Sequence, residues 1–221
     1  MDIQLLREAT AADHTSVEDS VPLMGADLTL DTYLSVMRRM YGIVVAWEEY
    51  AAARAPSWMQ PMLAERSRRQ LLEEDLRFFG VQPGRQLTGG VPAGPADVAL
   101  PGLALPGLAL AGFETESQLL GAMYVMEGSR LGGLHIARHV ESVLGLTPGR
   151  GDSYFRGRAE GTGAMWKEFL DVLRTRVPEA QADQAIFAAR AMFRAFGEWM
   201  RGTDPPLPAA AHPDLLAEVA V

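Results

Sequence analysis

The chain has 221 residues, 48% of them hydrophobic, so it can form one substantial core, as expected of a single domain. It contains no cysteine, which excludes disulfides, thiolate-held metal sites and cysteine nucleophiles, so any metal must be held by nitrogen or oxygen. A formal net charge of −8 argues against broad nucleic-acid binding, which depends on a basic face.

The sequence predicts neither a targeting segment nor a membrane anchor. The N-terminal stretch MDIQLLREATAADH lacks a basic segment followed by an apolar run, so it does not resemble a signal peptide. The longest apolar stretch, around 98–113, is interrupted by prolines and glycines and cannot form a spanning helix. We therefore expect a cytoplasmic protein.

Apolar residues at three- and four-residue steps predict three helices before residue 80. Their expected ranges are Ile3–Asp19, Thr29–Arg54 and Glu65–Phe79. Asp2 is a suitable N-cap for the first helix, and Pro56 limits the second. The third should keep its leucines inside and its arginines outside, and Gly80 should end it.

Residues 80–112 combine many glycines and prolines, including the near-duplicate LPGLA at 100–104 and 105–109, which predicts a long irregular connection. Three further helices are predicted, over Glu116–Leu144, Gly161–Val177 and Glu179–Arg201. Thr115 and Gln118 have capping-box spacing, Gly145 closes the first of these helices, and Phe187 is one expected core position of the last. The prediction is one all-α domain over 1–221, with a flexible tail from about residue 202.

His14 is the histidine most suggestive of metal binding. It aligns with the apolar residues of the first helix, so its imidazole is expected to point inward. Glu18 lies one helical turn later, where a carboxylate can accept one ring N–H and leave the other nitrogen for a metal. A buried structural histidine beside a surface glutamate is the alternative. His135 and His139 have weaker claims to a metal role, and His212 is expected to be exposed in the tail.

The segment GSRLGG, residues 128–133, places three glycines inside an otherwise strong helix, at a cost of about 1 kcal/mol each relative to alanine. Glycines allow a backbone to approach something flat, or a helix to bend over it. Tight helix–helix packing through Gly128 and Gly132 is the alternative. Together with His14, the glycines fit a planar haem between the first helix and a glycine-kinked distal helix.

At these residues the chain resembles a known family. LREATAADHTSVE, residues 6–18, is similar to the proximal helix of haem oxygenases, and AMYVMEGSRLGGLHIARHV, residues 122–140, resembles their distal helix. The likeness is greatest to the bacterial enzymes that accompany bacteriophytochromes. It implies a haem oxygenase that uses O2 and an external electron donor, such as ferredoxin or a flavoprotein reductase, to convert haem to biliverdin, carbon monoxide and ferrous iron. A bacteriophytochrome is then an expected acceptor of biliverdin.

The resemblance also implies roles for individual residues. His14 matches the proximal iron ligand and Glu18 its hydrogen-bonding partner. The basic residues that match or replace propionate ligands are Arg7, Lys167 and Arg174. The residues expected over the distal face of the haem are Gly128, Ser129, Gly132 and Gly133.

The sequence departs from the family at two of these positions. Asp171 stands where an arginine is usual, so Arg174 is the expected substitute. Ser129 stands where many members have an aspartate that organises water around bound O2, so Arg130 or His135 is expected to assist.

Three other functions compete with this prediction. A haem-binding or haem-transfer protein would keep His14 without turning haem over. The thiaminase-like relatives use a cysteine nucleophile, which this chain lacks. A purely structural helical protein would leave His14 and the three glycines without a cause.

Overall fold

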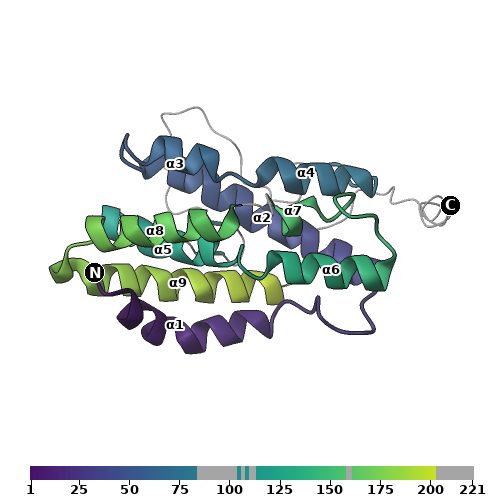
Figure 1. Cartoon of the computed structure of the whole chain (residues 1–221), viewed down its shortest axis with the longest axis horizontal. Coiled ribbons are helices and arrows are strands. Elements are labelled where there is room, and N and C mark those ends of the chain that lie inside the picture. Colours follow the sequence, from purple (N-terminus) through teal and green to yellow (C-terminus); the bar gives the residue numbers. More distant parts are fainter. Residues whose placement is uncertain (84–103, 106–107, 110–112, 158–160, 203–221) are drawn as a thin grey trace.

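Helix α9 (Ala182–Arg201) packs against two helices from earlier in the sequence, α1 (Ile3–Glu18) and α5 (Glu116–Gly128) (Figure 1). This computed structural model describes residues 1–83, 104–105, 108–109, 113–157 and 161–202. The contact between α5 and α9 is very close, since a Cβ on Gly121 would lie 2.1 Å from the Ala185 carbonyl oxygen. Only glycine fits there.

The predicted first and second helices are confirmed by α1 and by α2 (Leu30–Arg54). Asp2 caps α1 as expected by accepting from the Gln4 N–H at 2.8 Å. In Figure 1, α1 follows one long edge of the molecule, and α3 (Gln60–Glu65) and α4 (Arg69–Phe78) follow the opposite edge. Helix α2 packs against α3, α4 and α9, and so joins the two sides.

The third predicted helix is wrong at its start, because α3 and α4 are separate. Glu48 of α2 explains the break: its carboxylate accepts the Ser67 hydroxyl at 2.7 Å and the Arg68 N–H at 2.7 Å, which starts α4 after that point. The expectation that the arginines lie outside is also wrong for Arg66 and Arg68, which are buried. Gly80 follows α4 with a φ of 72°, as its predicted role as a stop requires.

The fourth predicted helix is divided into α5 and α6 (Gly133–Leu144). The capping box is confirmed at its start, where the Gln118 N–H binds the Thr115 hydroxyl and the Thr115 N–H binds the Gln118 side chain. Gly145 ends α6 in the left-handed conformation, as predicted. Between the two helices lies the segment Ser129–Gly132, called the α5–α6 turn from here on.

The last two predicted helices correspond to α8 (Thr162–Arg176), to the short 3-10 helix η2 (Glu179–Gln181) and to α9. Phe187 is a correction: its exposed fraction is 59%, because it lies on the outer side of α9. Ala188, Ala189 and Met192 of α9 lie in the core.

The duplicated LPGLA sequence, predicted to be irregular, contains two short strands, β1 (Ala104–Leu105) and β2 (Leu108–Ala109). They pair antiparallel, with Ala104 opposite Ala109 and Leu105 opposite Leu108. Most of the predicted irregular connection, and the predicted flexible tail after residue 202, lie outside the described residues. The described part of the chain is otherwise helical, and none of its helices is long and apolar enough to cross a membrane.

Buried acids attach α7 (Ser153–Arg156) to its neighbours. Asp75 of α4 accepts the backbone N–H groups of Ser153 and Tyr154 at 2.9 and 2.7 Å. Asp152 is fully buried, shares a hydrogen bond with Glu141 of α6 and lies 3.1 Å from the Arg156 guanidinium. Burial, and then the hydrogen bond with Glu141, raises the pKa of Asp152 to about 6.

Candidate functional site

The His14 side chain lies on α1 and is 56% exposed, so the expectation that it points into the core is wrong. The helix packs against α9, and its residues Leu6 and Thr10 are buried, whereas His14 is exposed and makes a T-shaped contact with the Phe193 ring, with the ring centroids 5.7 Å apart. Asp13 makes the adjacent polar contacts with α9 through Arg190 and Arg194. The imidazole is thereby supported on one side and accessible on the other.

Glu18 lies next to His14, as the spacing predicted. Its Oε2 atom is 3.4 Å from Nδ1 of His14, and the Glu18 side chain is 67% exposed. A carboxylate beside Nδ1 favours the tautomer that carries the proton on that nitrogen. The lone pair of Nε2 is then available to a metal.

The α5–α6 turn is built from 3-10-like hydrogen bonds. The N–H of Leu131 binds the Gly128 carbonyl at 3.0 Å, and the N–H of Gly133 binds the Arg130 carbonyl at 3.1 Å. Ser129 donates its hydroxyl to the Met126 carbonyl at 2.8 Å, one turn earlier. The hydroxyl therefore also satisfies a carbonyl at the end of α5.

The three glycines of this region have different surroundings. A Cβ on Gly133 would lie 2.4 Å from the Phe155 carbonyl oxygen, so Gly133 allows α6 to pack closely against α7. A Cβ on Gly128 would make ordinary contact with Trp166 at 3.7 Å, and one on Gly132 would meet nothing within 4 Å. None of the three has a positive φ, so backbone conformation does not explain them. The helix-packing alternative, which named Gly128 and Gly132, is therefore wrong for Gly132, where the space is open, and the close packing is instead at Gly133.

The predicted propionate ligands are exposed. Arg7 lies on α1, and Lys167 and Arg174 lie on α8. Arg174 donates to the Asp171 carboxylate at 2.6 Å on the same helix, so the residue expected to replace the family arginine is already paired with the residue that departs from it. The described contacts do not join these cations to His14 in one cluster.

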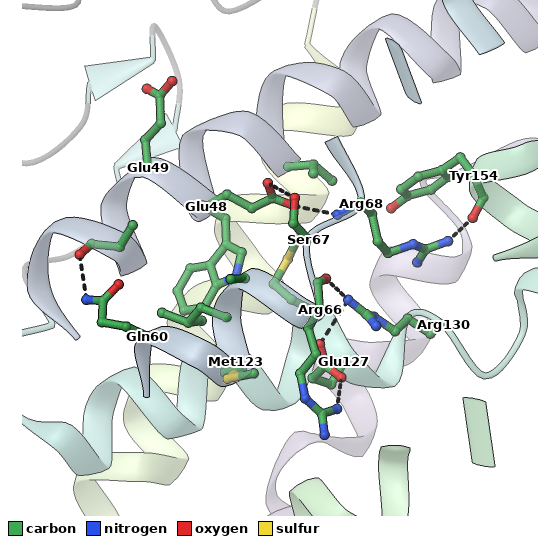
Figure 2. A pocket seen from close by; sticks show the side chains of 16 residues that line it. Glu48, Glu49, Gln60, Arg66, Ser67, Arg68, Met123, Glu127, Arg130 and Tyr154 are labelled. Atoms are coloured by element: carbon green, nitrogen blue, oxygen red, sulfur yellow. Dashed lines mark hydrogen bonds and ion pairs between the residues drawn. The ribbon is translucent and has the colours of Figure 1, made fainter. Parts of the chain in front are cut away.

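Sequence reasoning missed a buried triad, formed by Arg66, Glu127 and Arg130. Glu127 ends the apolar stretch of α5, and its side chain is 4% exposed. Its Oε2 atom accepts from Arg66 at 2.7 Å, and its Oε1 atom lies 3.2 Å from Nη2 of Arg130. Figure 2 shows the Arg130 side chain directed toward Arg66, whose backbone carbonyl it also hydrogen-bonds. A single acidic residue after the buried run from Leu119 to Met126 was the available signal.

The triad removes Arg130 from the role expected of it beside Ser129, because its guanidinium contacts Glu127 and the Arg66 carbonyl (Figure 2). Burial lowers the pKa of Arg130, and the negative charge of Glu127 opposes that shift. His135, the other expected helper, is exposed on α6.

A pocket of about 290 Å³ lies beside the triad. Residues of α2, α3 and α5 form its apolar side, with Trp47, Leu63 and Met123 among them, and Arg130 and Glu127 border it. The pocket includes none of the predicted ligands or turn glycines. Haem is therefore not expected there.

The donor groups fit haem better than a free metal ion. In the described ranges there is no group of three or more histidine, aspartate or glutamate side chains that could hold an ion. A single accessible imidazole suffices for an iron whose other ligands come from a porphyrin. The open space at Gly132 and the half-exposed Leu131 are compatible with a flat apolar ring beside the α5–α6 turn.

Sequence similarity relates the chain to haem oxygenases. A family model described as Heme oxygenase matches residues 3–202. A curated protein named Heme oxygenase, from Xanthomonas campestris pv. campestris (strain 8004), is 32% identical over 173 residues, which are 75% of this chain and 87% of that protein.

Solved structures show the same fold. The haem oxygenase of Leptospira interrogans is 20% identical, with a TM-score of 0.66, and the match covers 90% of this chain and 97% of that one. The NO- and CO-bound haem oxygenase of Neisseria meningitidis is also 20% identical, with a TM-score of 0.66, over 93% of this chain and 98% of that one. Since the family model spans nearly all of the sequence and a relative exceeds 30% identity, the chain belongs to the haem oxygenase family.

Proposed function

We propose that this chain opens haem oxidatively with His14 as the axial ligand of the iron. Haem is the substrate that membership of the family implies. The observation that carries the proposal is the accessible imidazole of His14, with the Glu18 carboxylate 3.4 Å from its Nδ1 atom. A carboxylate at that nitrogen fixes the tautomer and the orientation of the ring, as in other metal-bound histidines.

The remaining predicted residues have roles around this ligand. Arg7 and Lys167 are proposed to hold the haem propionates, because exposed cations can pair with carboxylates, and Arg174 could assist if it leaves Asp171. The α5–α6 turn is proposed to cover the opposite face of the haem, where Gly132 leaves room and Gly128 adds no side chain. Ser129 is proposed to order water there through the lone pairs of its hydroxyl.

When bound, haem supplies the iron at which O2 is activated during conversion to biliverdin, carbon monoxide and ferrous iron. The electrons are proposed to come from a ferredoxin or a flavoprotein reductase. The sequence Glu127-Gly128-Ser129 before Leu131-Gly132-Gly133 supports a place among the bacteriophytochrome-associated enzymes, with a bacteriophytochrome as acceptor of biliverdin. The cytoplasmic location stays a prediction.

The test is to add haem to the purified protein and to record its absorption with a reductant, first without O2 and then with it. Bleaching of the haem band to a bilin spectrum is the expected result. A stable haem complex that never bleaches would instead identify a haem-binding protein without turnover.

His14→Ala tests the ligand assignment in the same assay. We expect this variant to fold but to lose the imidazole-ligated spectrum and most turnover, and added free imidazole should restore the spectrum. His139→Ala is the matched control, since His139 is a helix histidine whose ring contacts the Gly25 carbonyl at 3.1 Å. If His14→Ala keeps the spectrum and rate of the parent, the assignment is wrong.

A further inference from the structure

We propose that Arg130 is a positioning residue: its contacts with Glu127 and Arg66 fix the conformation of the α5–α6 turn. The inference rests on the proposed function, because the turn is the segment proposed to cover haem. Arg130 lies within the turn, and its guanidinium is directed toward Glu127 and the Arg66 carbonyl (Figure 2).

The triad is too buried to be an ordinary surface ion pair. The side chains of Arg66, Glu127 and Arg130 are 2%, 4% and 15% exposed. Buried charges of this kind seldom stabilise a fold more than well-packed apolar residues would. Moreover, Nε of Arg66 and Nε of Arg130 are buried without a hydrogen-bond partner in the described part of the chain. A buried charged group that is present despite this cost in stability is expected to have a specific role.

That role is suggested by the weak packing of the turn itself. The residues on either side of the turn lie close to other elements, since a Cβ on Gly128 would contact Trp166 and one on Gly133 would overlap the Phe155 carbonyl. Between them, Leu131 is half exposed and Gly132 has nothing within 4 Å of a Cβ. On the other side the pocket of about 290 Å³ borders Arg130. Apart from the Ser129 hydroxyl, which binds the Met126 carbonyl of its own helix end, the contacts of Arg130 with Glu127 and with the Arg66 carbonyl are the polar side-chain contacts that hold the turn in the described structure.

The same triad also reaches α8. Arg66 donates to the Met165 carbonyl at 3.1 Å and to the Glu168 carboxylate at 2.9 Å. These two residues flank Lys167, a proposed propionate ligand. Arg66 thus connects the α5–α6 turn, which is proposed to cover haem, to α8, which carries the proposed propionate ligand Lys167. The triad can therefore fix the positions of the turn and of α8 relative to each other.

Arg130→Met tests the proposal. It removes the contact with the turn but leaves Arg66 and Glu127 as a balanced pair, whereas Glu127→Gln would leave Arg130 without the Glu127 anion and Arg66 with the exposed Glu168 carboxylate, and would confuse positioning with folding. Arg68→Met is the matched control, because Arg68 is a buried arginine of the same pocket whose guanidinium binds the carbonyl and the ring of Tyr154, a residue outside the turn.

Two measurements are needed. Amide hydrogen exchange of the apoprotein, followed by mass spectrometry over peptides that contain 129–133, reports the turn without haem. Single-turnover haem degradation at matched haem loading reports the chemistry. We expect Arg130→Met to speed exchange in these peptides and to slow turnover roughly tenfold, the effect of losing one charge-assisted contact, while Arg68→Met does neither.

Unchanged exchange in Arg130→Met would overturn the positioning role, and so would faster exchange with a turnover rate equal to that of Arg68→Met. An equal effect of both variants on exchange would mean that the pocket, and not Arg130, holds the turn. If the parent protein itself does not degrade haem, the proposed function fails, and exchange alone then decides whether Arg130 holds the turn.

Discussion

Ser129 uses its hydroxyl within its own helix end, where it donates to the Met126 carbonyl at 2.8 Å. It carries no charge, so we expect it to order water by hydrogen bonding and not to deliver protons as an acid. Ser129→Ala should remove one neutral hydrogen bond, about 1 kcal/mol, and slow turnover only several-fold. Single-turnover haem degradation at matched haem loading measures this.

A slowing of a hundredfold or more in Ser129→Ala would indicate that the hydroxyl takes part in general acid–base assistance. It would then act without help from Arg130, whose guanidinium is bound to Glu127 and the Arg66 carbonyl. His135 would remain as the exposed residue nearby that can bind water. His135→Ala, measured in parallel, separates the two contributions.

Individual site residues were predictable to different degrees. The contact of His14 with Glu18 follows from helix geometry alone, because residues four apart share a face. The exposure of His14 was not predictable, since it depends on how α1 packs against α9, a helix from the other end of the chain. The triad was not predictable either, because 61 residues separate Arg66 from Glu127 along the chain.

Among the elements, the break between α5 and α6 contains two adjacent glycines, Gly132 and Gly133, whose surroundings differ. Gly133→Ala should destabilise the apoprotein by about 1 to 3 kcal/mol, because its Cβ would overlap the Phe155 carbonyl at 2.4 Å. Gly132→Ala should be neutral or stabilise by up to about 1 kcal/mol, because its Cβ would enter open space at a helical φ of −81°. Chemical denaturation of the two apoproteins measures the contrast.

The larger substitution Gly132→Leu extends this contrast to haem. It should leave the apoprotein folded and weaken haem binding, since the side chain would occupy the space proposed for the ring. If Gly132→Leu unfolds the protein but Gly133→Ala does not, the surroundings of the two glycines have been assigned the wrong way round.

Helix ends that depend on local sequence agree with prediction. Asp2, the Thr115–Gln118 capping box and Gly145 act where their spacing indicated. Ends that depend on distant residues do not: Glu48 starts α4 from another helix, and Phe155 packs against the start of α6. Local patterns therefore predicted which segments are helical better than where long helices break.

At the scale of the molecule, the acids around α7 make stability depend on pH. Because the pKa of Asp152 is raised from 3.8 to about 6, the native protein binds its proton more tightly than the unfolded chain does. The resulting stabilisation is complete below about pH 3.8 and is lost as the pH rises through about 6. Burial acts to raise the pKa of Glu141, but its hydrogen bond with Asp152 and its contacts with Arg156 lower the pKa overall. The lowered pKa of Glu141 offsets part of the pH dependence that Asp152 contributes.

Asp152→Asn should remove this dependence, because an amide can donate to Glu141 as the protonated carboxyl does. Relative to the parent, the variant should gain on the order of 1 kcal/mol between pH 5 and pH 7.5. Urea denaturation at several pH values measures it, with Glu198→Gln on the exposed side of α9 as the control. Parallel stability curves for the parent and Asp152→Asn would show that Asp152 does not titrate in this range.

Helix α9 has a consequence for the whole site. It supports Phe193 beneath His14, and its Ala185 carbonyl leaves no space for a side chain on Gly121 of α5. The helix that carries the proposed iron ligand and the helix that leads into the α5–α6 turn are thus both mounted on α9. The width of the proposed haem site therefore depends on one helix to which no haem ligand is assigned, and a substitution that adds bulk to α9 or tilts it should change that width from both sides at once.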